Sequence, residues 1–152
     1  MAAVLTAAAR HGRERGGVLV EFALVVPILL VIFAAIVDFG LMMQRREVVT
    51  NAAREGARIA VLPGYDTADV QARVNEYLNN GIQAGTSANA TTTVTNTTLT
   101  GVAPVVSMRQ VDVALTTRYS ILGPAMQLIG GSDFGAITVR ARSSMRLEVP
   151  SP

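Results

Sequence analysis

A glycine doublet followed by a glutamate stands at the start of the longest apolar stretch of the chain. Gly16 and Gly17 end a basic leader, and Glu21 lies four residues beyond Gly17, inside the apolar run. A peptidase that cut after Gly16 would leave a new α-ammonium group on Gly17. In an array of such helices, Glu21 of one subunit would pair with the Gly17 amine of its neighbour. That pairing would offset the desolvation of both charges and set the axial register between subunits.

A simpler interpretation of Glu21 fits the same spacing. A carboxylate at the head of a membrane helix can remain in the headgroup region, where its charge costs little. The residue pattern by itself leaves pairing and simple solvation equally open.

Few other residues of the chain are suited to chemistry. There is no Cys, and the single His, His11, lies in the leader. Thiol catalysis, disulfides and Cys-ligated metals are therefore excluded, and no Ser-His-Asp arrangement can form outside the leader. Asp66 and Asp69 are better explained as charges at a helix N-terminus than as a catalytic pair. We expect no enzyme activity, no cofactor and no metal site.

The basic charge is concentrated in the leader. All 13 basic residues are Arg, and three of them lie in the first 16 residues beside a single acidic residue. From Gly17 onward, 10 Arg balance 10 Asp and Glu. A nucleic-acid-binding protein would carry its Arg residues clustered on the folded body, so nucleic acid is not an expected partner.

Residues 18–43 predict a membrane-spanning helix. Their 26 residues would reach about 39 Å as a helix, more than the roughly 30 Å of a bilayer core. The uncharged part, Phe22 to Val37, reaches only about 24 Å, so at least one of Glu21 and Asp38 must lie near an interface or be paired. A cleaved secretory signal has an apolar region of only about 7–15 residues. A buried soluble helix would need a larger partner than the rest of the chain.

Charge and proline add detail to this helix. Arg residues precede the span in excess, which predicts a cytoplasmic N-terminus and an extracytoplasmic C-terminal part. Pro27 removes a backbone hydrogen bond to the carbonyl of Ala23 and is expected to kink the helix. Such a bend would let subunits adjust their packing in an array, although a tolerated membrane proline explains Pro27 as well.

Residues 44–61 continue as an amphipathic helix. Ala52, Gly56 and Ala60 recur every four residues and form a face of small side chains that permits close packing. The opposite face is charged, with Glu55 and Arg58 spaced for a weak ion pair. A solvated surface accounts for most of these charges, and contact with a partner protein is the alternative.

The remaining residues predict a small α+β head. Pro63-Gly64 ends the long helix, and a second helix is expected over about 67–80, capped by Asp66 or Thr67. An edge strand is expected around 91–99, and alternating patterns predict strands from Val111 and from Ile137. Between these two strands, a short helical turn is expected from Pro124 to Gly130-Gly131. The predicted fold is a long N-terminal helix continuing into a head with a second helix and two or three antiparallel strands. We divide the chain into a leader (1–16), the N-terminal helix (17–61) and the head (62–152).

Several separated motifs, taken in order, resemble the TadE-like family of pilin-like proteins of the Tad (Flp) tight-adherence system. Gly16 to Phe22 is similar to the prepilin-peptidase site of type IV pilins, a Gly followed by four residues and then Glu. The similarity covers roughly residues 15–61 and includes three stretches: Gly16-Gly17 through Glu21-Phe22 to Pro27, then Asp38-Phe39-Gly40, then Asn51-Ala52-Ala53-Arg54-Glu55-Gly56-Ala57-Arg58.

The resemblance implies a pseudopilin or minor pilin of the cytoplasmic membrane that is involved in adhesion or secretion. It implies cleavage between Gly16 and Gly17 by a prepilin peptidase, with Glu21 and Phe22 taking part in subunit assembly. Phe22 stands where the major Flp pilins commonly have Tyr, which points to an accessory pilin. Other pilins, the Tad inner-membrane assembly platform and membrane lipid are the implied partners. Partner contacts are expected among the residues of the later motifs: Asp38, Gly40, Asn51, Arg54, Glu55, Gly56 and Arg58.

A second hypothesis remains for the same features. The chain would then be an unprocessed single-pass membrane anchor with a small extracytoplasmic binding head. An intact N-terminus and a monomer or simple dimer would distinguish this anchor from a processed pilin.

Overall fold

The computed structural model describes residues 2–82, 86–99, 106–130 and 135–147 of the chain. Within them, three α-helices, one short 3-10 helix and three strands follow one another along the sequence. Their bounds are α1 (Ala2–Ala60), α2 (Thr67–Gly81), η1 (Thr86–Asn89), β1 (Ala90–Leu99), β2 (Val106–Arg118), α3 (Gly123–Gly130) and β3 (Ala136–Arg146).

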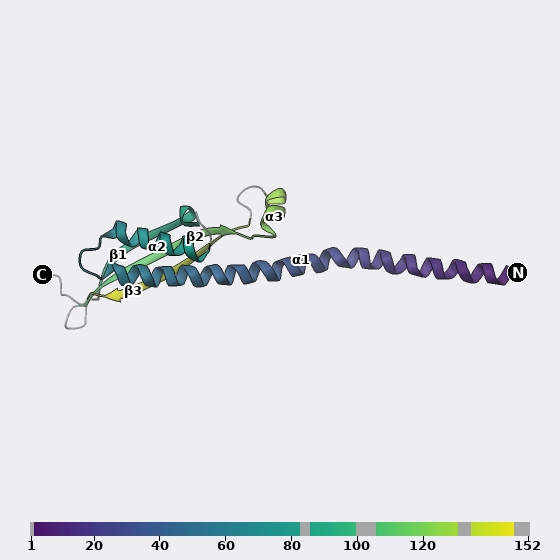
Figure 1. Cartoon of the computed structure of the whole chain (residues 1–152), viewed down its shortest axis with the longest axis horizontal. Helices are drawn as coiled ribbons and strands as arrows, with labels where there is room; N and C mark the ends of the chain where they lie inside the picture. Colours follow the sequence, from purple (N-terminus) through teal and green to yellow (C-terminus); the bar gives the residue numbers. More distant parts are fainter. Residues whose placement is uncertain (1, 83–85, 100–105, 131–134, 148–152) are drawn as a thin grey trace.

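Helix α1 is a single rod of 59 residues, which corresponds to about 88 Å. Its C-terminal part packs on the sheet, and its N-terminal part projects far beyond the head (Figure 1). The helix continues through Pro27 without a break and includes the leader that the sequence interpretation keeps separate. The kink predicted at Pro27 stays a prediction.

The three strands form one antiparallel sheet in the order β1-β2-β3. α1 contacts β2 and β3, and α2 contacts α1 and β1, so the two helices cover one face of the sheet (Figure 1). The predicted α+β fold is confirmed, with three strands. β2 begins at Val106, five residues before the alternating pattern that predicted it, because its first half also pairs with β1 and β3.

The connection between α1 and α2 is a short turn with a capped helix start. Gly64 has φ +86°, a left-handed conformation that costs glycine little. The Asp66 side chain accepts hydrogen bonds from the backbone N–H groups of Ala68 and Asp69, and the Asp69 side chain accepts one from the Asp66 N–H. This reciprocal capping box starts α2 where the sequence predicted a cap.

The small-residue face of α1 allows the core to close. Gly56 lies so close to α2 and β2 that an added Cβ would come within 2.7 Å of the Val74 side chain and 3.2 Å of the Val111 side chain. Aliphatic side chains of α2 and β2 fill the space beside the alanines of α1. The fully buried members are Val49, Ala52, Ala53, Ala57, Ala60, Val70, Val74, Leu78, Val111, Val113 and Leu115. The close packing predicted for this helix face is therefore confirmed, and its partners are α2 and β2.

Helix α3 stands apart from this core. It follows β2 and is displaced from the sheet towards the projecting part of the long helix (Figure 1). The short helix predicted at Pro124 is confirmed, with its start at Gly123; Gly131 lies outside the described residues.

Candidate functional site

The projecting part of α1 is an uncovered apolar surface. The most apolar 18-residue window within Gly16–Ala60 has a mean hydropathy of 2.9, and none of it is buried inside the chain. Large side chains such as Leu24, Ile28 and Phe33 are 64–70% exposed. A soluble helix of this composition would be covered by the protein, so the surface requires an apolar environment from elsewhere. The helix is long and apolar enough to cross a bilayer, and it fits a membrane anchor.

The predicted cleavage and pairing residues lie at the N-terminal end of this surface. Gly16, Gly17, Glu21 and Phe22 are exposed on the helix, and no atom lies within 4 Å of the position that a Cβ would take at either glycine. Each glycine weakens a helix by about 1 kcal/mol relative to alanine, so the doublet is an easily unwound point. Among the residues that the structure describes, Glu21 makes no hydrogen bond or ion pair.

The second acidic residue of the span, Asp38, has a different environment. It is the one charged residue classed as buried in the described part of the chain, with 1% of its surface exposed. Oδ1 accepts hydrogen bonds from the N–H groups of Ser120 at 2.8 Å and Ile121 at 2.9 Å. Oδ2 accepts the N–H of Leu122 at 2.8 Å, with a longer contact of 3.2 Å from Ile121. Three successive backbone donors therefore enclose one carboxylate.

The position of these donors explains why a carboxylate is stable there. Leu122 accepts the hydrogen bond from the Met126 N–H that starts α3, so Asp38 lies at the N-terminal end of that helix. Helix N-termini present free N–H groups and a partial positive charge, which favour an anion. The length of the uncharged span requires Glu21 or Asp38 to lie near an interface or to be paired, and Asp38 is paired within its own chain.

Arg45 makes a second contact between α1 and the same loop. Arg45 is seven residues after Asp38 and so on the same face of the helix. Its Nη1 donates to the carbonyl oxygen of Arg118 at 2.6 Å, and its Nη2 donates to Oγ of Ser120 at 2.8 Å. Together, Asp38 and Arg45 hold both the donors and the acceptors of the β2–α3 connection against α1. We call these two side chains and residues 118–122 the exit clamp.

Glu55 connects α1 to α2 through Arg73. It accepts hydrogen bonds from Arg58 at 2.8 and 3.0 Å and from Arg73 at 3.3 Å. Arg73 also pairs with Glu76 at 2.9 Å. The Arg58 hydrogen bonds, followed by the charges of Arg58 and the contacts of Arg73, lower the pKa of Glu55 against the opposing effect of partial burial. The predicted ion pair between Glu55 and Arg58 is confirmed.

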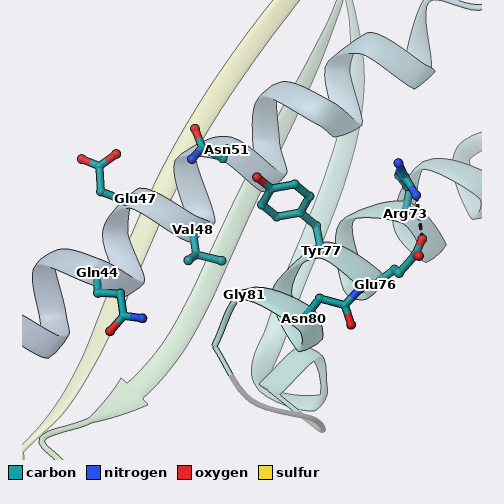
Figure 2. Close-up of a pocket in the computed structure, with 9 residues that line it drawn as sticks. All are labelled: Gln44, Glu47, Val48, Asn51, Arg73, Glu76, Tyr77, Asn80 and Gly81. Atoms are coloured by element: carbon teal, nitrogen blue, oxygen red, sulfur yellow. Dashed lines mark hydrogen bonds and ion pairs between the residues drawn. The ribbon is translucent and has the colours of Figure 1, made fainter.

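A groove of about 520 Å³ runs between α1 and α2. Figure 2 shows Asn51 and Glu47 on the α1 side and the Tyr77 ring on the α2 side. The groove has mixed polar and charged walls and is open to solvent. Its complete lining is Gln44, Glu47, Val48, Asn51, Arg73, Glu76, Tyr77, Asn80 and Gly81.

The residues suggested as partner contacts divide into two groups. Asp38 and Gly56 are buried inside the chain, so a partner would reach them only by displacing their own neighbours. Exposed or partly exposed positions are Gly40, Asn51, Arg54, Glu55 and Arg58, of which Glu55 and Arg58 already pair with each other. Within the ranges described above, no group of three or more His, Cys, Asp or Glu could hold a metal ion.

These features define a class of protein: a long helix whose apolar part fits a membrane anchor and whose C-terminal part belongs to a small α+β head, with the exit clamp where the two meet. Comparison with known families narrows the class. Residues 16–58 match the family model described as TadE-like protein, and the suspected resemblance to that family is confirmed over this segment. The TadE-like family is associated with pili, and it is not known as a family of enzymes. Neither the curated proteins nor the solved structures contain a significant match to this chain.

Sequence reasoning missed the exit clamp. Asp38 was recognisable as a charge at the end of an apolar run, but its partners are main-chain N–H groups more than 80 residues away. The acceptors of Arg45, the Arg118 carbonyl oxygen and Ser120 Oγ, are likewise more than 70 residues away along the chain. The one available signal was the cost of leaving Asp38 unpaired beside lipid.

Proposed function

We propose that this protein is a pseudopilin or minor pilin of a Tad (Flp) pilus, inserted in the cytoplasmic membrane and cleaved after Gly16 by a prepilin peptidase. The observation that carries the proposal is the coincidence of two features. The family match begins at Gly16, the residue before the proposed scissile bond, and it spans the whole uncovered apolar helix. The proposed orientation has the N-terminus in the cytoplasm and the head outside, where it takes part in pilus assembly for adhesion or secretion.

The local structure supports cleavage at this point. A peptidase must hold its substrate in an extended form, so the helix has to unwind around the scissile bond. Gly16 and Gly17 make no side-chain contacts that would oppose unwinding, and together they lower helix stability by about 2 kcal/mol relative to alanines. The cut after Gly16 also makes Glu21 the fifth residue of the mature chain.

The exposure of Glu21 supports its role in assembly. Its carboxylate is free among the described residues, and 16 uncharged residues follow it towards the head. In a bundle of mature subunits, the Gly17 α-ammonium of a neighbour would satisfy this carboxylate and fix the register. Phe22 would pack beside this pair. On the head, the exposed side chain of Arg54 and the groove at Asn51 are the surfaces that we assign to other pilins or the assembly platform.

The first test is the intact mass and N-terminal residue of the protein recovered from membranes of its native host, with and without the prepilin peptidase. We expect a peptidase-dependent chain that begins at Gly17. A chain beginning at Val18 would be lighter by one glycine residue, so mass also resolves the ambiguity of the doublet. An intact N-terminus in both samples would contradict processing and favour the unprocessed single-pass anchor.

The pairing of Glu21 has a separate test. Glu21→Gln keeps the size of the side chain and removes its charge, so membrane insertion and cleavage should persist while incorporation into the pilus complex is lost. The control is Asp66→Asn, which also removes the charge of an exposed carboxylate on the head, at a residue that does not line the groove and where Asn is an equally good N-cap. Crosslinking of subunits in membranes measures incorporation. Normal incorporation of Glu21→Gln would rule out the pairing.

A further inference from the structure

The segment that follows β2 is unusually apolar for a surface loop. No charged residue occurs between Tyr119 and Ser132. Leu128 is 90% exposed and Ile121 is 48% exposed, so neither large aliphatic side chain is buried within the chain. Large apolar side chains gathered on a surface without charges indicate a contact with something apolar.

The exit clamp fixes the level of this segment along α1. Because Asp38 binds the N–H groups of residues 120–122, the start of α3 lies level with Asp38. Large side chains of α1 at the same level are also uncovered: Ile36 is 65% exposed and Phe39 is 63% exposed. Large apolar side chains of α1 and of the β2–α3 segment are thus exposed at the same level along the long helix.

The length of the span places this level at the edge of a bilayer. Starting from Phe22, the roughly 30 Å of a hydrocarbon core ends about 20 residues further on, near Leu41. Asp38 then lies just inside the hydrocarbon edge, and Arg45 and Arg46 lie among the headgroups. A carboxylate at that depth needs hydrogen-bond donors that lipid does not provide, and residues 120–122 supply them.

We propose that residues Ile121–Leu128 are a membrane-contact segment. Helix α3 lies in the interfacial layer of the leaflet on the head's side, with Leu128 and Ile121 among the upper parts of the acyl chains. The protein therefore has two membrane contacts, the span and α3, and together they fix how the sheet is oriented over the bilayer. This inference rests on the membrane insertion of α1 in the proposed function.

Because the chain has no Trp, the fluorescence of a single introduced Trp shows how deeply that residue lies in the bilayer, with no signal from other Trp residues. The full-length protein is reconstituted in phosphatidylcholine vesicles whose acyl chains carry bromine, a contact quencher of Trp fluorescence. Leu128→Trp is compared with Phe33→Trp in the span and with Tyr65→Trp, an exposed position on the turn after α1. We expect Phe33→Trp and Leu128→Trp to lose at least half of their fluorescence, and Tyr65→Trp to lose less than a tenth.

The possible results distinguish this proposal from the one on which it rests. If Phe33→Trp is quenched and Leu128→Trp behaves like Tyr65→Trp, the anchor stands and the contact of α3 with lipid is refuted. If Phe33→Trp is also unquenched, insertion itself fails, and both proposals fall. A second copy of the chain could instead cover Leu128. A blue-shifted Leu128→Trp emission with no bromine quenching at any protein-to-lipid ratio would show that the side chain is covered by protein, and it would refute contact with lipid.

Discussion

Replacement of Asp38 by Asn should release the β2–α3 connection from α1 while leaving the rest of the head folded. Asn keeps the shape of the side chain, but its NH₂ group would face a backbone N–H where Oδ2 of Asp38 now accepts a hydrogen bond. The hydrogen bonds of Asp38 involve a charged acceptor, and such bonds are worth about 1.5–3 kcal/mol each. At least one is lost, and the Leu122 N–H is left facing a donor. We therefore expect the clamp to weaken by about 2–3 kcal/mol.

Amide hydrogen exchange on the full-length protein in lipid nanodiscs measures this loss locally. At 1.4 kcal/mol for each factor of ten, exchange of the amides of residues 120–122 should be about 30- to 150-fold faster in Asp38→Asn. Amides in the centre of β2, such as that of Val113, should keep their protection, because the core does not involve Asp38.

The matched control is Asp66→Asn at the N-cap of α2. Asp66 also accepts two backbone hydrogen bonds, but it is exposed, and Asn is as good an N-cap as Asp. Exchange at the start of α2 should therefore change by less than about threefold. Unchanged protection of residues 120–122 in Asp38→Asn would refute the reasoning, since it would mean that the carboxylate contributes nothing to holding the loop.

Two further predictions concern the head. Gly56→Ala should lower the melting temperature by about 4–8 °C, because the added Cβ would come within 2.7 Å of the Val74 side chain. Overpacking of this kind costs about 1–3 kcal/mol, whereas the better helix propensity of alanine returns at most about 1 kcal/mol. Gly40→Ala should not lower the melting temperature, because no atom lies within 4 Å of the Cβ that would be added there. Equal melting temperatures of the two variants would contradict the packing argument. The lowered pKa of Glu55 means that its ion pairs contribute fully above its usual pKa of 4.5 and that this contribution is lost as the pH falls through the lower pKa of the folded state. Glu55→Gln should therefore remove up to about 1 kcal/mol of the free energy of unfolding at pH 7. When this free energy is measured by urea unfolding at different pH values, it should fall less towards acid pH in Glu55→Gln than in the unchanged protein. An equal fall in both proteins would exclude this role.

The elements of the head were predictable because each has a local signal. Alternation of Val111, Val113 and Leu115 predicts a strand with one buried face, and all three side chains are buried. The four-residue spacing of Ala52, Gly56 and Ala60 predicts a closely packed helix face. Asp66 predicts the start of α2 because an acidic residue there satisfies free N–H groups.

The exit clamp had no such signal. Its donors are backbone N–H groups, which every residue except proline possesses, so nothing in the types of Ser120, Ile121 and Leu122 indicates that they bind Asp38. Only the tertiary arrangement, in which the β2–α3 connection passes beside α1, brings them together. The pairing of β1 with β2 also depends on contacts across the sheet, and the Thr-rich β1 gave only a weak indication of its extent.

The nature of these contacts offers a physical reason why the family match ends at Arg58. The matched segment supplies the apolar span, the carboxylate of Asp38 and the small-residue face around Gly56. To bind this carboxylate and to pack on this face, the remainder of the chain must provide backbone N–H groups at one loop and branched aliphatic side chains at a few positions of α2 and β2. Many different sequences meet those two requirements. The residue types that the head must supply are therefore less specific than the residue pattern of the matched helix.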